Sequence, residues 1–85
     1  QAASEMAFYQ VTHRLARLIV ESRFGESSGT RLTQDQMAAR LGTVREVVAR
    51  SLRELERSGA IRVEKRRITI ADPGLLEQWT QGPWN

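Results

Sequence analysis

Two helix-start patterns ten residues apart, with a glycine between them, constrain this chain more than any other feature. Residues 33–36 read Thr-Gln-Asp-Gln, and residues 43–46 read Thr-Val-Arg-Glu. Both are capping-box patterns, in which a Thr hydroxyl and a Gln or Glu side chain three residues later satisfy free N–H groups at a helix start. Gly42 stands where the first helix would end, because glycine readily adopts the left-handed conformation that closes helices. The pattern predicts a helix-turn-helix.

The second of these helices, expected from residue 44 to about residue 57, is amphipathic. Its apolar stripe at helical spacing consists of Val44, Val47, Val48, Leu52 and Leu55. The opposite side carries Arg45, Glu46, Ala49, Arg50 and Arg53. We therefore expect one side to pack on a core and the other, which is mostly cationic, to be exposed. Gly59 is expected to end the helix.

Helices are also expected at both ends of the chain. Ser4 can cap a first helix that runs to about Ser22. Residues 24–29 are polar and rich in glycine, which is typical of a loop. Near the other end, Asp72 followed by Pro73 predicts the start of a short last helix, because proline is favoured at the first helical position.

Two short segments between these helices have the pattern of strands. Residues 61–63 and 68–70 alternate β-branched apolar residues with polar ones. The turn between them, at residues 64–67, contains neither glycine nor asparagine, so its geometry is left open. The order of elements predicts an α+β fold, a winged helix-turn-helix with a three-helix core and a β-hairpin wing.

The positive charge is concentrated in one part of the chain. The net charge is only +3, but residues 43–67 hold eight basic and four acidic side chains, a net charge of +4. All of the eight except Lys65 are arginines, whose planar fork fits phosphate groups and guanine edges. A solvated charged helix is the alternative explanation of such a segment.

Several classes of function find no support in the composition. The chain has no cysteine and one histidine, His13, so a metal site is not expected. Neither a nucleophilic triad nor a glycine-rich phosphate loop is present, so we do not expect an enzyme. No apolar run approaches the roughly 20 residues that span a bilayer, and residues 1–7 do not have the pattern of a signal peptide. We therefore expect a cytoplasmic protein without membrane contact.

The predicted fold and its charge point to double-stranded DNA as the partner. The major groove admits one α-helix, in which Arg45 and Arg50 could each donate two hydrogen bonds to a guanine and Glu46 could accept one from a cytosine. Contacts to the DNA backbone are expected from Arg53, Lys65, Arg66 and Arg67. The alternative for the three base-reading residues is an exposed face on which Glu46 and Arg50, four residues apart, form an ion pair.

Four stretches of the sequence resemble the DNA-binding domain of Crp/Fnr transcription regulators. They are RLTQDQMAARLGTVREVVARSL at residues 31–52, LERSGAI at residues 55–61, RITIADP at residues 67–73 and VTHRLA at residues 11–16. The resemblance covers roughly residues 11–77. Its most specific element is Arg-Glu followed by Arg at positions 45, 46 and 50. In this family that trio implies reading of a TGTGA-like half-site, and Thr33 matches a position that contacts phosphate.

The chain departs from the family pattern at the start of the second helix. The family often has Ser or Thr directly before the first arginine, where this chain has Val44, with the hydroxyl one position earlier at Thr43. It often has Thr directly after the glutamate, where this chain has Val47. Both departures remove possible hydrogen bonds to phosphate. We still expect Thr43 to contact the DNA backbone.

The resemblance also implies a larger protein. Family members carry an effector-binding β-roll, which often binds a cyclic nucleotide, and a dimerisation helix before this domain. These 85 residues contain no such roll and begin with Gln1, so we expect a fragment in which this chain binds no cofactor. Residues 1–10 are expected to be the end of a linker, residues 11–80 the DNA-binding domain and residues 81–85 a flexible tail. The family further implies a homodimer and contact with RNA polymerase.

Two other functions remain open at this point. A winged helix can serve as a protein-protein interaction module, although such modules lack a basic helix face. A non-specific DNA binder would have the same charge but would not distinguish a TGTGA-like site from random duplex.

Overall fold

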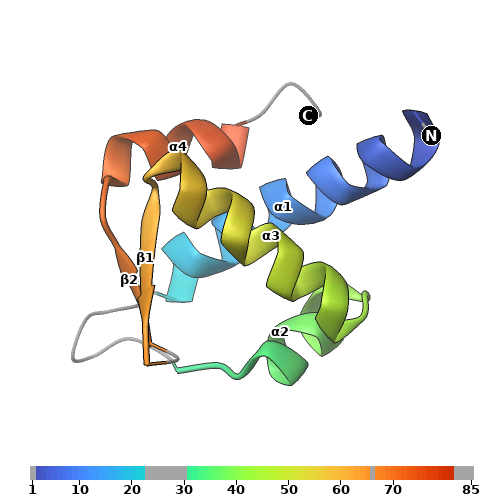
Figure 1. Ribbon diagram of the computed structural model, residues 1–85, viewed down its shortest axis with the longest axis horizontal. Helices are drawn as coiled ribbons and strands as arrows, with labels where there is room; N and C mark the ends of the chain where they lie inside the picture. Colours follow the sequence, from blue (N-terminus) through green and yellow to red (C-terminus); the bar gives the residue numbers. More distant parts are fainter. Residues whose placement is uncertain (1, 23–30, 66, 82–85) are drawn as a thin grey trace.

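The computed structural model describes residues 2–22, 31–65 and 67–81. The elements in chain order are α1 (Ala2–Ser22), α2 (Gln34–Leu41), α3 (Arg45–Ser58), β1 (Ile61–Glu64), β2 (Arg67–Ile70) and α4 (Pro73–Gln81). Figure 1 shows α3 crossing in front of α1, the β1–β2 hairpin beside the carboxyl end of α3, and α4 returning after the hairpin. The predicted loop at residues 24–29 and the part of the predicted tail after Gln81 lie outside the described residues.

The first helix begins earlier than its expected cap. Because α1 starts at Ala2, Ser4 lies within the helix, and the prediction that Ser4 caps it was wrong. Alanine has the highest helix propensity, so the Ala2-Ala3 pair continues the helix past the serine. Residues 2–10, expected to end a linker, are therefore continuous with the rest of α1, and Phe8 is buried.

The start and end of α2 are as predicted. Thr33 Oγ1 accepts a hydrogen bond from the Gln36 N–H at 3.1 Å, and Gln36 Oε1 accepts one from the Thr33 N–H at 2.8 Å. Gly42 has a φ of +70°, and the N–H of Thr43 donates to the Ala38 carbonyl at 3.0 Å. A capping box and a left-handed glycine thus set both ends of the helix.

The start of α3 differs from the prediction by one residue. Val44, and not Thr43, is the N-cap residue, and no side chain caps the helix. The backbone of Thr43 already belongs to the turn that closes α2, so the first helical residue is Arg45. The predicted second capping box was therefore wrong, since Glu46 lies one position too early to close it. Val44 was also expected to pack on the core, but it is 61% exposed.

The hairpin has the predicted alternation. Ile61 pairs with Ile70 and Val63 with Ile68, so these apolar side chains share one face of the antiparallel pair. The last pair before the turn joins Glu64 to Arg67. The carbonyl of Ala60 accepts hydrogen bonds from the N–H groups of Ala71 and Asp72, which fixes the end of β2 beside the end of α3.

The last helix begins as predicted. Asp72 Oδ1 accepts from the N–H of Leu75 at 3.0 Å, and Pro73 is the first helical residue. The helix packs against α1.

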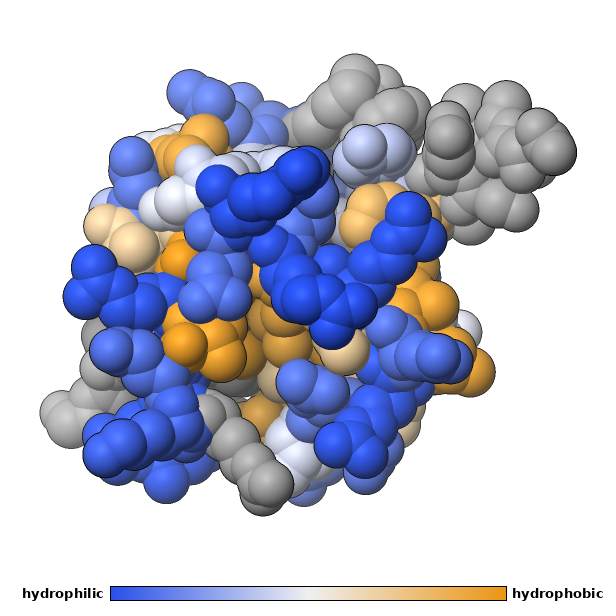
Figure 2. All heavy atoms as spheres, viewed as in Figure 1, coloured by the Kyte–Doolittle hydropathy of each residue, from blue (hydrophilic) through white to orange (hydrophobic). Residues whose placement is uncertain are grey.

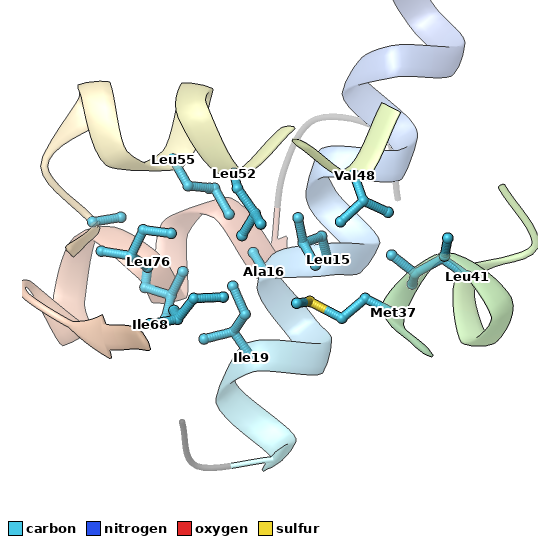
Figure 3. Packing of buried hydrophobic residues seen from close by; sticks show 13 residues of the cluster. Leu15, Ala16, Ile19, Met37, Leu41, Val48, Leu52, Leu55, Ile68 and Leu76 are labelled. Atoms are coloured by element: carbon cyan, nitrogen blue, oxygen red, sulfur yellow. The ribbon is translucent and has the colours of Figure 1, made fainter. Parts of the chain in front are cut away.

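One hydrophobic core joins all of these elements. Figure 3 shows Leu15 and Ile19 of α1 among the buried side chains of α3 and the hairpin, with Met37 of α2 pointing toward them. Met37 was predicted to lie in the core, and this is confirmed. Buried apolar residues from the other elements are Val48, Leu52, Leu55, Ile61, Ile68 and Leu76. The architecture is the predicted α+β winged helix-turn-helix, with α4 following the wing.

Candidate nucleic-acid interface

The predicted base-reading residues lie on the exposed side of α3. Val48, Ser51, Leu52 and Leu55 are buried on one side of the helix, and the exposed residues lie on the other. We call the exposed side chains Arg45, Glu46, Arg50 and Arg53 the outward face of α3. Figure 2 shows that hydrophilic side chains cover much of the molecule where α3 lies nearest the viewer. The predicted division of this helix into a core side and a cationic side is confirmed, except that Val44 is exposed and Val47 is only half-buried.

The cations of the outward face are not neutralised by ion pairs within the described part of the chain. The salt bridge on α3 joins Arg57 to Glu54 at 2.9 Å, nearer the carboxyl end. Glu46 and Arg50 do not form the ion pair that was the alternative for this face. The positive charge of Arg45, Arg50 and Arg53 is therefore available to an anionic partner.

Arg50 has an aromatic neighbour on another helix. Its guanidinium carbon lies 4.1 Å from the centroid of the Phe8 ring on α1, a cation–π contact. Phe8 is only 9% exposed. A guanidinium that stacks by its plane keeps its N–H donors at the edge of that plane, where they can still reach an acceptor. Sequence reasoning missed this contact, because it depends on how α1 crosses α3.

The residues expected to contact the DNA backbone lie at several places. Thr33 is exposed, and its hydroxyl accepts the capping hydrogen bond of α2 but retains its own hydrogen as a donor. Thr43 is half-buried in the turn before α3. Lys65 and Arg67 are exposed at the hairpin turn, and Lys65 has a φ of +49°. Arg66 lies outside the described residues. In Figure 1 the turn end of the hairpin and α2 both lie low in the view, with the hairpin at the left and α2 at the right.

The side chain of the single histidine, His13, lies between α1 and α4 and contacts the end of α4. His13 is buried, and its Nδ1 lies 2.6 Å from the Trp79 carbonyl oxygen of α4. Arg17 Nη2 lies 3.5 Å from His13 Nε2 and donates to the Thr80 carbonyl at 3.4 Å. Trp79 itself donates through Nε1 to Ser58 Oγ at 3.3 Å, so the prediction that it packs the last helix against the domain is confirmed. No metal-binding group of His, Cys, Asp and Glu occurs among the described residues.

None of the described helices combines the length and apolar character needed to cross a membrane. This finding concerns α1 above all, since the other helices are much shorter.

Comparison with known proteins gives a family and a fold. The family described as the Crp-like helix-turn-helix domain matches residues 13–79. A CRP/FNR-family transcriptional regulator from Thermus thermophilus is similar in structure, with a TM-score of 0.71 and 29% sequence identity over 84% of this chain. A CRP-family transcriptional regulator from the same organism has a TM-score of 0.71 and 22% identity over 94% of this chain. This chain spans 40% of the first regulator and 46% of the second. No curated protein matches the chain.

Proposed function

The chain belongs to the Crp-like helix-turn-helix family, a family of DNA-binding domains of transcription regulators, and we propose that it reads a TGTGA-like half-site of double-stranded DNA. The observation that carries the proposal is the outward face of α3. Three arginines that are exposed and not ion-paired within the described residues stand opposite the side of the helix that forms the core. An α-helix of this kind fits the major groove of B-DNA.

In this proposal Arg45, Glu46 and Arg50 read the bases. Each arginine donates two hydrogen bonds to O6 and N7 of a guanine, and Glu46 accepts from the amino group of a cytosine. Their exposure supports this role, because base edges must reach the side chains without rearrangement of the core. Each such pair contributes about 1–3 kcal/mol of discrimination against the wrong base.

The remaining proposed contacts position the domain without reading sequence. They are made to phosphates by Thr33, Thr43, Arg53, Lys65, Arg66 and Arg67. Arg66 lies outside the described residues, and we include it because it follows Lys65 in the sequence of the hairpin turn. The free N–H groups at the start of α3, where no side chain caps the helix, are further donors directed at phosphate.

We further propose that the full-length protein acts as a homodimer on an inverted repeat and contacts RNA polymerase. In such dimers the half-sites lie about one helical turn apart, or a multiple of it. These two proposals rest on family resemblance. We propose that residues 11–80 are the DNA-binding domain of that full-length protein.

The first test is a titration of the chain against two duplexes at two salt concentrations. One duplex carries an inverted TGTGA-like repeat and the other a scrambled sequence. We expect a strong preference for the repeat and weaker binding to both at high salt, since phosphate contacts release counterions. Equal binding to both duplexes would favour a non-specific binder. Absence of binding, also in a covalently joined dimer, would favour the protein-interaction module.

Substitutions on α3 then separate base reading from charge. Arg45→Ala and Arg50→Ala are each expected to reduce the preference for the repeat by about 5- to 150-fold. Arg57→Ala is the matched control, because Arg57 lies on the same helix but pairs with Glu54. If both test variants kept the full preference, the base-reading assignment would be wrong.

A further inference from the structure

Val44 is an unusual residue at the start of α3. It occupies the N-cap position with extended backbone, makes no side-chain cap hydrogen bond and is 61% exposed. It is the exposed large hydrophobic residue of the described part of the chain. An exposed isopropyl group therefore lies at the start of α3, one residue before Arg45.

This position does not serve the stability of the helix. Ser, Thr, Asp and Asn are strongly preferred as N-cap residues, and Val is among the poorest. Among the described residues, Thr33 and Asp72 follow this preference, since they cap α2 and α4 through side-chain oxygens. The exception thus falls at the amino end of the helix that the proposed function places in the major groove.

The side chain of Val44 limits what it can contact there. It has neither donor nor acceptor, so it cannot bind a phosphate or the polar edge of a base. The one apolar group that a base pair presents in the major groove is the C5-methyl group of thymine. An exposed valine at the start of α3 can therefore contact a base pair in the major groove only through this methyl group.

We propose that Val44 reads a thymine by contact with its C5-methyl group, next to the base pairs read by Arg45 and Glu46. The inference rests on the proposed function, because it needs the amino end of α3 in the major groove. It adds one specificity-determining residue that makes no hydrogen bond to DNA. It also accounts for an apolar residue at a position where a hydroxyl would stabilise the helix.

The test replaces each thymine of the preferred duplex in turn by deoxyuridine. Deoxyuridine has the same hydrogen-bonding edge as thymidine and lacks only the methyl group. For the unmodified chain, we expect one replacement to weaken binding about three- to fivefold, the amount that corresponds to one buried methyl group. For Val44→Ser, we expect the same replacement to have no effect. Val44→Ile, which keeps an apolar side chain, is the matched control and should retain the methyl response.

The variant provides its own check on folding. Val44→Ser supplies a good N-cap, so its Tm should rise, and a lost methyl response then cannot come from unfolding. A methyl response that persists in Val44→Ser would overturn the proposal and assign the contact to another residue, such as Ala49.

Failure of the inference and failure of the proposed function are distinguishable. If the chain preferred the TGTGA-like duplex, and Arg45→Ala relaxed that preference, but no deoxyuridine replacement changed binding, only the role of Val44 would be wrong. If the chain did not distinguish the repeat from the scrambled duplex, the proposed function would fail and the role of Val44 with it.

Discussion

At the scale of single residues, Arg50 is the side chain whose surroundings matter most. The guanidinium would be free to sample many rotamers on an isolated helix, and ordering it costs conformational entropy when it binds. The Phe8 ring at 4.1 Å restricts this freedom before any partner arrives. Phe8, which is buried, is thus placed to position Arg50.

We expect Phe8→Leu to weaken binding to the preferred duplex about two- to fivefold, the usual strength of an exposed cation–π contact. Leucine still fills the buried space, so the loss should come from the ring. The measurement is a double-mutant cycle with Arg50→Ala, in which Phe8→Leu should have no further effect. Phe8→Tyr, which keeps the ring, is the control. An equal loss in the Arg50→Ala background would show that Phe8 acts through packing alone.

At the scale of elements, the hairpin contains the one strained backbone position outside glycine among the described residues. Lys65 has a φ of +49°, a conformation that costs side chains with a Cβ atom roughly 1 kcal/mol. The register leaves only residues 65 and 66 between the paired Glu64 and Arg67, and such short turns need positive φ angles. A lysine at this position gives up some stability and places a cation at the tip of the wing.

For Lys65→Gly, stability and DNA binding should therefore change in opposite directions. The free energy of unfolding should rise by roughly 0.5–1 kcal/mol, measured by urea denaturation, because glycine adopts positive φ without strain. The salt dependence of DNA binding should become shallower by about one unit if Lys65 contacts a phosphate. Lys65→Ala serves as the control that removes the charge and keeps the strain. An unchanged salt slope in both variants would remove Lys65 from the interface.

The last helix is held at its carboxyl end by side chains of α1. The final four carbonyl groups of a helix have no partner within it, and Trp79 and Thr80 belong to this group in α4. His13 Nδ1 and Arg17 Nη2 lie at hydrogen-bond distance from these two oxygens. A carbonyl oxygen can only accept, so Nδ1 of His13 is the donor in its contact with Trp79.

His13→Ala is expected to lower the free energy of unfolding by about 1–3 kcal/mol, because a partly buried carbonyl loses its donor. His13→Asn should recover much of this loss, since the asparagine amide can place an N–H near the position of Nδ1. Thermal unfolding of the three proteins measures the difference. Equal stability of the alanine and asparagine variants would mean that packing, and not the hydrogen bond, holds α4.

At the scale of the whole molecule, a buried polar pair ties α1 to α3. Thr12 Oγ1 lies 2.9 Å from both the Phe8 carbonyl oxygen and Ser51 Oγ, and both side chains are fully buried. A hydroxyl has one hydrogen, so the two contacts are satisfied together when Thr12 donates to Phe8 and accepts from Ser51. This buried pair joins α1 to α3, the helix that carries the outward face.

A double-mutant cycle should show that Thr12 and Ser51 act as a unit. Thr12→Val alone is expected to cost about 1–3 kcal/mol of unfolding free energy, because the Ser51 hydroxyl loses its partner in the core. Adding Ser51→Ala should cost little more, because no unpaired hydroxyl is then left in the core. Urea denaturation of the four proteins gives the coupling. Strictly additive losses would contradict the hydrogen-bonded pair.

Much of the fold follows from interactions within about four residues, and these could be predicted from the sequence. The capping box at Thr33, the left-handed Gly42 and Gly59, and the Asp72-Pro73 start of α4 are all local features, and the structure confirms each. The predictions failed where two helix signals compete for the same residues. The N–H of Thr43 donates to the Ala38 carbonyl in the turn that closes α2. Thr43 therefore does not serve as the N-cap of α3, and Val44 occupies that position.

The sequence by itself also determined which side chains of α3 are exposed together, because helical periodicity places Arg45, Glu46 and Arg50 away from the apolar stripe. Their reading of bases remains a prediction. Only the tertiary structure decided the long-range pairs: Phe8 with Arg50, Thr12 with Ser51, and His13 with the end of α4. Periodicity states which face of a helix is buried, but the partner of each side chain depends on where the packed helices cross.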